Sequence, residues 1–171
     1  MEDLLILVDE NDVEVGSMEK LEVHQTAALH RAFSVFIFNS KRELLLQQRA
    51  DEKYHSGGLW SNTCCSHPRK GEKTFDTINR RLKEEMGLKC KIGFKFSFIY
   101  KIDFENGLSE HELDHVYFGM SNDLPKPNPL EVKNYKYIGL MDLQNDIEQN
   151  PGIYSGWLKI CLPAVIQQFN D

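Results

Sequence analysis

Four short stretches of the chain contain side chains that can bind a metal ion or transfer a proton. They lie far apart in the sequence: His24 and His30 in HQTAALH, Cys65 and His67 in CCSH, Glu84 and Glu85 in KEEMG, and Glu110 and Glu112 in EHE. Imidazole, thiolate and carboxylate groups are the common protein ligands of divalent metals. The fold must bring these stretches together before they can form one site.

The neighbouring cysteines Cys64 and Cys65 do not have the spacing of a structural zinc site, because zinc-binding cysteines usually stand in CxxC-like pairs. A disulfide between adjacent cysteines would require a strained geometry, and a disulfide framework is not expected in a cytoplasmic protein. If SNTCCSH is an extended segment, Cys65 and His67 share one face and Cys64 points to the other. The two thiols should therefore have different roles.

The same alternation places three acids, Glu110, Glu112 and Asp114, on one face of a predicted strand. Two interpretations of this row remain open. Charged rows are usually solvated, so an exposed acidic edge strand is the common case. The alternative is a functional site built on this strand.

The histidines leave a similar choice, because many histidines are surface residues or have a hydrogen-bond partner in the core. This interpretation applies to His55, His111 and His115, and it could also apply to His24 and His30. In the other interpretation, a set of nitrogen and oxygen donors suits Mn²⁺, Mg²⁺ or Zn²⁺ in a high coordination number. That set is His24, His30, His67, Glu110 and Glu112. Cys65 would then be a free thiol beside the metal, able to donate a proton or, once ionised, to accept one.

The chain has the composition of a soluble globular protein. Its 171 residues, 41% hydrophobic and 27% charged, can enclose one core, so we expect a single domain over residues 1–171. The net charge of −6 does not favour nucleic acid or anionic lipid as a partner. The apolar stretch at residues 4–8 is too short for a signal peptide or a membrane span. We therefore expect a cytoplasmic protein that has no membrane partner.

The apolar pattern predicts a mixed β/α fold. Two hairpins are expected, 4–8 with 13–18 and 32–38 with 43–49, and further strands are expected at 59–63, 91–102, 112–120 and 134–140. Three helices are expected: 75–86, capped by Thr74 and ended by Gly87; 141–150; and a last helix that starts at Trp157. The residues expected to face the core are Phe75, Ile78, Leu82 and Met86 in the first helix, and Trp157, Ile160, Cys161, Ala164 and Val165 in the last.

Several stretches, in order along nearly the whole chain, resemble the type I isopentenyl-diphosphate isomerases, a family built on the Nudix fold. The matching stretches are Lys20 to His24, LHRAFSVFIFN, QQRADEK, WSNTCCSHP, RRLKEEMGL, SEHELDHVYF and YSGW. The combination of NTCCSHP with a downstream EHE is very specific. The resemblance implies an α+β fold, an α/β/α sandwich with a mixed sheet, a Nudix-type loop-helix-loop and extra N-terminal strands.

The Nudix signature itself is only partly present. It runs from a Gly to a Glu and then to Arg-Glu-apolar-x-Glu-Glu-x-Gly, and the corresponding residues here are Ser66, Glu72, Arg80, Arg81, Leu82, Glu84, Glu85 and Gly87. Ser66 replaces the opening glycine. Arg81 replaces the glutamate that helps Nudix hydrolases to load metal and activate water. The isomerases depart from the signature in the same way.

The resemblance implies a role for each candidate residue. Cys65 and Glu112 would be the catalytic pair, assisted by Tyr100 and Trp157. His24, His30, His67, Glu110 and Glu112 would hold a Mn²⁺, Zn²⁺ or Mg²⁺ ion. Glu85 would bind a Mg²⁺ ion that arrives with the diphosphate, and the diphosphate itself would contact Lys20, Arg49, Lys53 and Arg81.

The implied reaction converts isopentenyl diphosphate into dimethylallyl diphosphate by protonation and deprotonation through a tertiary carbocation. The substrate would be a small prenyl diphosphate, and neither a nucleic-acid partner nor a flavin cofactor is expected. The protein would be a monomer or a weak homodimer. Two alternatives remain open from the residues. One is a Nudix pyrophosphohydrolase. Glu84 and Glu85 favour this function, whereas Arg81 argues against it. The other is a non-catalytic module that binds a diphosphate or a metal and would have no use for Cys65.

Overall fold

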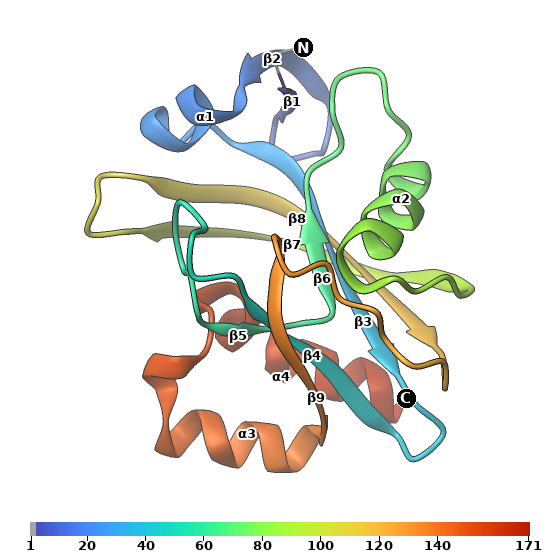
Figure 1. The fold of residues 1–171 in the computed structure, drawn as a ribbon. Helices are drawn as coiled ribbons and strands as arrows, with labels where there is room; N and C mark the ends of the chain where they lie inside the picture. Colours follow the sequence, from blue (N-terminus) through green and yellow to red (C-terminus); the bar gives the residue numbers. More distant parts are fainter. Residues whose placement is uncertain (1–2) are drawn as a thin grey trace.

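The computed structural model describes residues 3–171, which form a mixed sheet of nine strands with helices on both faces (Figure 1). The strands are β1 (Leu4–Val8), β2 (Glu14–Glu19), β3 (His30–Phe38), β4 (Glu43–Arg49), β5 (Trp60–Ser61), β6 (Cys64–Ser66), β7 (Ile92–Asp103), β8 (Ser109–Met120) and β9 (Val132–Gly139). The helices are α1 (Lys20–Thr26), α2 (Thr74–Met86), α3 (Leu140–Gln149) and α4 (Gly156–Asn170), with a short 3-10 helix at Pro151–Ile153. The expected sandwich, with β1 and β2 as additional N-terminal strands, is confirmed.

Strand β3 is the central strand of the site. It pairs antiparallel with β6, where Ser34 lies opposite Cys65, and parallel with β8, where His30 lies opposite Glu112. The expected hairpins are present: β1 pairs with β2, and β3 pairs with β4 at Phe38 and Leu44. Since β6 and β8 pair with the same strand, residues distant in sequence are brought to one region of the sheet.

The core has two layers because successive side chains of β3 point to opposite faces. Phe33, Val35 and Ile37 pack in one buried cluster with Leu82 of α2. Phe36 points to the opposite face and packs in another buried cluster, together with residues of α3 and α4. Burial of each large apolar side chain contributes about 1.5–3 kcal/mol to stability. The sheet that carries the site is thus held between two hydrophobic layers.

Helix α2 differs from the prediction at its first turn. Thr74 is the first helical residue and not the cap; the cap is Lys73, whose side chain makes no capping bond. The carboxylate of Glu72 instead accepts hydrogen bonds from the backbone of Arg69 and from the hydroxyl of Thr77. The remaining predicted stripe is buried, but Phe75 is 53% exposed, because the first turn extends beyond the core. The helix ends at Gly87, as predicted, in the left-handed conformation with φ 65°.

Helix α4 begins at the predicted place, but its buried face is rotated from the predicted one. Leu158 and Leu162 are buried, whereas Ile160 is 48% exposed. With about 100° per residue, Ile160 lies on the side away from these leucines. The prediction for Ile160 was therefore wrong, while Trp157 is buried as expected.

Helix α1 was not among the predicted elements. Its seven residues are too few to produce a helical repeat of apolar positions. The side chain of Glu19 caps its first turn, and Ala27 ends it in the left-handed conformation. Within residues 3–171, none of the helices combines the length and apolar character needed to cross a membrane.

Candidate active site and metal centre

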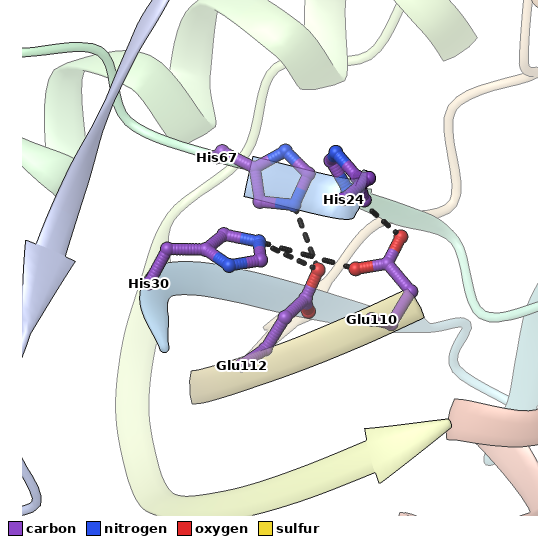
Figure 2. Close-up of side chains that lie close together, drawn as sticks. All are labelled: His24, His30, His67, Glu110 and Glu112. Carbon is purple, nitrogen blue, oxygen red and sulfur yellow. Dashed lines mark hydrogen bonds and ion pairs between the residues drawn. The ribbon is translucent and has the colours of Figure 1, made fainter. Parts of the chain in front are cut away.

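Five side chains from separate parts of the chain converge in a buried cluster (Figure 2). Their ligand atoms lie within 4.8 Å of one another. The members are His24 from α1, His30 at the start of β3, His67 just after β6, and Glu110 and Glu112 from β8. The row of acids on β8 is therefore a site and not an exposed edge, because β8 lies between β3 and β7 and its acids are buried.

Backbone hydrogen bonds orient two of the histidines toward the centre of the cluster. Nδ1 of His24 donates to the carbonyl of Lys20 at 2.6 Å, and Nδ1 of His30 donates to the carbonyl of Ala28 at 2.9 Å. This tautomer leaves the Nε2 lone pairs available to a metal, which is the usual arrangement of metal-binding histidines. Nε2 of both histidines approaches Glu110, at 3.4 Å from His24 and 3.9 Å from His30.

The cluster fits a divalent metal ion. Within residues 3–171, buried Nε2 of His30 and buried Oε2 of Glu110 have no hydrogen-bond partner. Polar atoms that are buried without a partner are costly, and two carboxylates directed at imidazole lone pairs would repel them. A cation between these donors removes both costs. Imidazole nitrogen and carboxylate oxygen are ligands that suit Mg²⁺, Mn²⁺ and Zn²⁺.

Both carboxylate oxygens of Glu112 contact other side chains of the site. One carboxylate oxygen accepts a hydrogen bond from the hydroxyl of Tyr100 at 2.6 Å, and the other lies 2.7 Å from Nε2 of His67 and 3.5 Å from Nε2 of His30. Burial opposes its ionisation, but the neighbouring Glu110, His67 and His30 hold the pKa of Glu112 well below its usual value. Glu112 is therefore a carboxylate, and its hydrogen-bond donor Tyr100 is one of the two residues that the resemblance implies as assisting the catalytic pair.

The two neighbouring cysteines point to opposite faces of the sheet, as alternation predicts. Cys64 packs in the apolar cluster beneath α2, whereas Cys65 lines a pocket together with Glu112. His67 stands two residues beyond Cys65, about 6.6 Å along an extended chain. Since His67 bonds Glu112, the thiol and the carboxylate occupy the same pocket. Burial raises the pKa of Cys65 far above its usual value, although Arg49 opposes this shift, so Cys65 is a protonated thiol.

One part of this pocket has a high density of positive charge. It is lined by all four predicted cations: Lys20, Arg49, Lys53 and Arg81. Burial and the nearby ammonium group of Lys53 lower the pKa of Lys20. Within the described residues 3–171, Nε of Arg49 and Nε of Arg81 are buried without a hydrogen-bond partner. Crowded cations with free donors are typical of a site for phosphate groups.

Glu85 lies at the border between these cations and the thiol. Its carboxylate accepts hydrogen bonds from Arg81 at 2.6 Å and from Gln47 at 2.9 Å. Arg81 also bonds Glu84 at 2.8 Å. Arg81 therefore pairs with the two adjacent acids of the Nudix signature, and Glu85 alone of these two lines the pocket.

Trp157 lines the wall of the pocket and is 3% exposed. Its indole Nε1 donates to Oδ1 of Asn62 at 3.2 Å, and the amide of Asn62 donates to the carbonyl of Cys64 at 2.9 Å. The guanidinium of Arg49 lies 5.1 Å from the centre of the indole ring. Asn62 thus connects Trp157 to the strand that carries Cys65.

The structure brings all predicted site residues together, and it adds some that the sequence did not indicate. Tyr54 and His55 line the pocket, and Glu131 forms ion pairs with Lys53 and Arg81. Of the two cases expected for His55, a surface residue or a histidine with a partner in the core, the second holds, because His55 is buried and its Nε2 lies 2.6 Å from Glu110. A histidine in a loop gives no periodic signal, so only its place in the fold identifies it.

Other residues of the sequence analysis lie outside the pocket lining. His111 bonds the carbonyl of Ala27, and His115 pairs with Asp12, so both have structural partners as expected. Asp114 continues the row of acids but is buried, and it accepts a hydrogen bond from Ser34 at 2.7 Å. Burial and the charge of Glu112 raise the pKa of Asp114 well above its usual value.

Comparisons with known proteins identify the family. The NUDIX domain model matches residues 28–156. The isopentenyl-diphosphate Delta-isomerase 2 of Aromatoleum aromaticum is 52% identical over 166 residues, which cover 97% of this chain and 88% of that protein. The chain belongs to the isopentenyl-diphosphate Delta-isomerase family.

Further similarities agree with membership of the isomerase family. The isopentenyl-diphosphate Delta-isomerase of Pectobacterium atrosepticum is 52% identical, over 94% of this chain and 90% of that protein. Among solved structures, DR0079 from Deinococcus radiodurans has a TM-score of 0.78 at 18% identity, over 94% of this chain and 98% of that chain. The latter similarity concerns the fold alone. The match of the NUDIX domain model identifies the fold of this chain as Nudix.

Proposed function

We propose that the protein interconverts isopentenyl diphosphate and dimethylallyl diphosphate in isoprenoid biosynthesis. The observation that carries this proposal is that the thiol of Cys65 and the carboxyl group of Glu112 line one pocket together with a group of cations. Moving a double bond by one carbon requires the addition of one proton and the removal of another. Together these two groups supply one proton and one acceptor.

The placement of the two groups supports proton transfer on a bound alkene. Cys65 is on β6 and Glu112 is on β8, and both strands pair with β3. A flat alkene between them would be in contact with a proton donor and a proton acceptor without diffusion of either group. Tyr100 hydrogen-bonds Glu112 and would help to set its protonation during the reaction. Because the reaction is reversible, donor and acceptor exchange roles in the opposite direction.

Protonation of the alkene would create a tertiary carbocation, which water would capture in an open site. Trp157 is buried in the wall of the pocket and presents an aromatic ring that offers no nucleophile. A cation over an indole face is stabilised by about 2 kcal/mol when water is excluded. The hydrogen bond from Trp157 to Asn62 would hold the ring in place.

The remaining charged residues would bind the diphosphate. Lys20, Arg49, Lys53 and Arg81 would contact its oxygens, and Glu85 would hold a Mg²⁺ ion that arrives with it. The cluster around Glu110 would hold Mn²⁺, Zn²⁺ or Mg²⁺. When bound, that ion would neutralise the buried acids and polarise the groups attached to it. This arrangement would position the five-carbon chain against Cys65 and Glu112.

An activity assay separates this proposal from hydrolysis. The protein, supplied with Mg²⁺ and Mn²⁺, is incubated with isopentenyl diphosphate, and both dimethylallyl diphosphate and free phosphate are measured. We expect dimethylallyl diphosphate to form until equilibrium, without release of phosphate. Release of phosphate or pyrophosphate without isomerised product would instead support the hydrolase alternative. No turnover of either kind would support a binding module.

A further inference from the structure

His55 contacts the metal cluster but is not one of the five converging ligands. Its Nε2 lies 2.6 Å from Oε1 of Glu110, and the side chain is 4% exposed. The hydroxyl of Ser56, 3.1 Å away, can donate to Nδ1. In that tautomer Nε2 carries the proton and donates it to Glu110. His55 is therefore a buried hydrogen-bond donor directed at a carboxylate of the cluster.

This hydrogen bond determines how Glu110 is turned. Oε1 of Glu110 accepts from His55, whereas Oε2 is buried without a hydrogen-bond partner among residues 3–171. Oε2 lies on the side of His30, at 3.9 Å from its Nε2. With one oxygen held by His55, the other is free to bind an ion. A carboxylate with both oxygens unheld could rotate away from the cluster.

The ring of His55 packs against two other aromatic rings. It stacks on Phe104, with ring centroids 4.5 Å apart and an angle of 13° between the planes. It is nearly perpendicular to the ring of Trp157, with centroids 5.8 Å apart and an angle of 85°. A buried side chain packed against two aromatic rings can take few other rotamers, so its donor is held in one direction.

We propose that His55 is a positioning residue: it donates a hydrogen bond to Glu110, orients that carboxylate toward the metal, and couples the cluster to Trp157. The proposal rests on the proposed function of the cluster as a metal site. Groups that hydrogen-bond a metal ligand orient it, and their loss typically weakens metal binding by about 10- to 100-fold. The same ring contacts Trp157 in the pocket wall, so His55 joins the metal ligand to the proposed cation-binding face.

Metal affinity of His55 variants tests this role without a measurement of activity. The full-length protein is stripped of metal, and its dissociation constants for Mn²⁺ and Zn²⁺ are measured by calorimetric titration. His55→Phe and His55→Leu remove the donor, and two such variants are used in case one folds poorly. His55→Gln keeps an amide N–H near the position of Nε2. His115→Phe is the matched control, because His115 is on the same strand as Glu110 but pairs with Asp12.

We expect His55→Phe and His55→Leu to bind both ions about 10- to 100-fold more weakly than the wild type. His55→Gln should stay within about threefold of the wild type, as should His115→Phe. Unchanged affinity in both donor-free variants would overturn the proposal, and so would an equal loss in His55→Gln and His55→Phe. If the wild type itself binds neither Mn²⁺ nor Zn²⁺ at the cluster, the metal centre of the proposed function fails, which is a different result.

Discussion

Cys65→Ser is expected to lower kcat by about three orders of magnitude or more while the protein remains folded. A serine hydroxyl is a much weaker acid than a thiol, so it cannot exchange a proton with the alkene at a useful rate. Glu112→Gln should cause a loss of similar size, because it removes both a proton acceptor and a carboxylate of the cluster. The measurement is steady-state turnover of isopentenyl diphosphate, with thermal unfolding as the check of folding.

Cys64→Ser is the matched control for Cys65→Ser. Cys64 is buried in the apolar cluster beneath α2, so its replacement should reduce stability and leave turnover within a few fold of the wild type. Loss of turnover in Cys64→Ser together with an active Cys65→Ser would contradict the assignment of the two faces of β6.

Removal of metal is expected to have the second large effect. Chelation should abolish turnover and lower the melting temperature, because the buried acids and histidines of the cluster would lose the ion between them. An ion present at about a thousand times its dissociation constant stabilises the native state by about 4 kcal/mol. Turnover and melting temperature are measured before chelation, after it, and after the return of Mn²⁺, Zn²⁺ or Mg²⁺.

The order of metal additions provides the control. Mg²⁺ alone should occupy the site that involves Glu85 and the diphosphate. If turnover returns only after a second kind of ion is added, the ion that chelation removed was bound at the His/Glu cluster. A stripped protein that keeps its turnover and its melting temperature would contradict the assignment of the cluster as a metal centre.

The sequence predicted those features of the site that follow from alternation along strands. The opposite directions of Cys64 and Cys65 and the shared face of Glu110 and Glu112 required only the period of two residues. That these strands meet on both sides of β3 follows from pairing between distant segments, which the residues alone do not reveal. The family resemblance supplied that step.

Features set by short or irregular segments were not predictable from the sequence. Helix α1, which supplies His24, is too short for a periodic pattern. His55 lies in a loop, and its importance comes from a contact with Glu110 more than fifty residues away. Thr74 was expected to cap α2, but Glu72 makes the hydrogen bonds at this end of the helix. In these cases tertiary contacts decide between local alternatives.

Substitution at one position of the Nudix signature changes the local chemistry. Arg81 bonds both Glu84 and Glu85, so these acids are paired with a cation where a hydrolase would have a third acid. The same guanidinium lines the pocket and is available to a diphosphate. We therefore propose that the scaffold binds the diphosphate through cations, while the proton chemistry takes place at Cys65 and Glu112.

The central claim is that side chains of the protein, which exchange protons with the solvent, also transfer protons to and from the carbon atoms of the substrate. Deuterium labelling tests this claim most directly. The protein is incubated with isopentenyl diphosphate and Mg²⁺ in D₂O, and the prenyl diphosphates are analysed by NMR and mass spectrometry. We expect dimethylallyl diphosphate with deuterium bound to carbon, and no label in a parallel sample of Cys65→Ser. Unchanged and unlabelled isopentenyl diphosphate after incubation with the metal-loaded wild type would contradict the account.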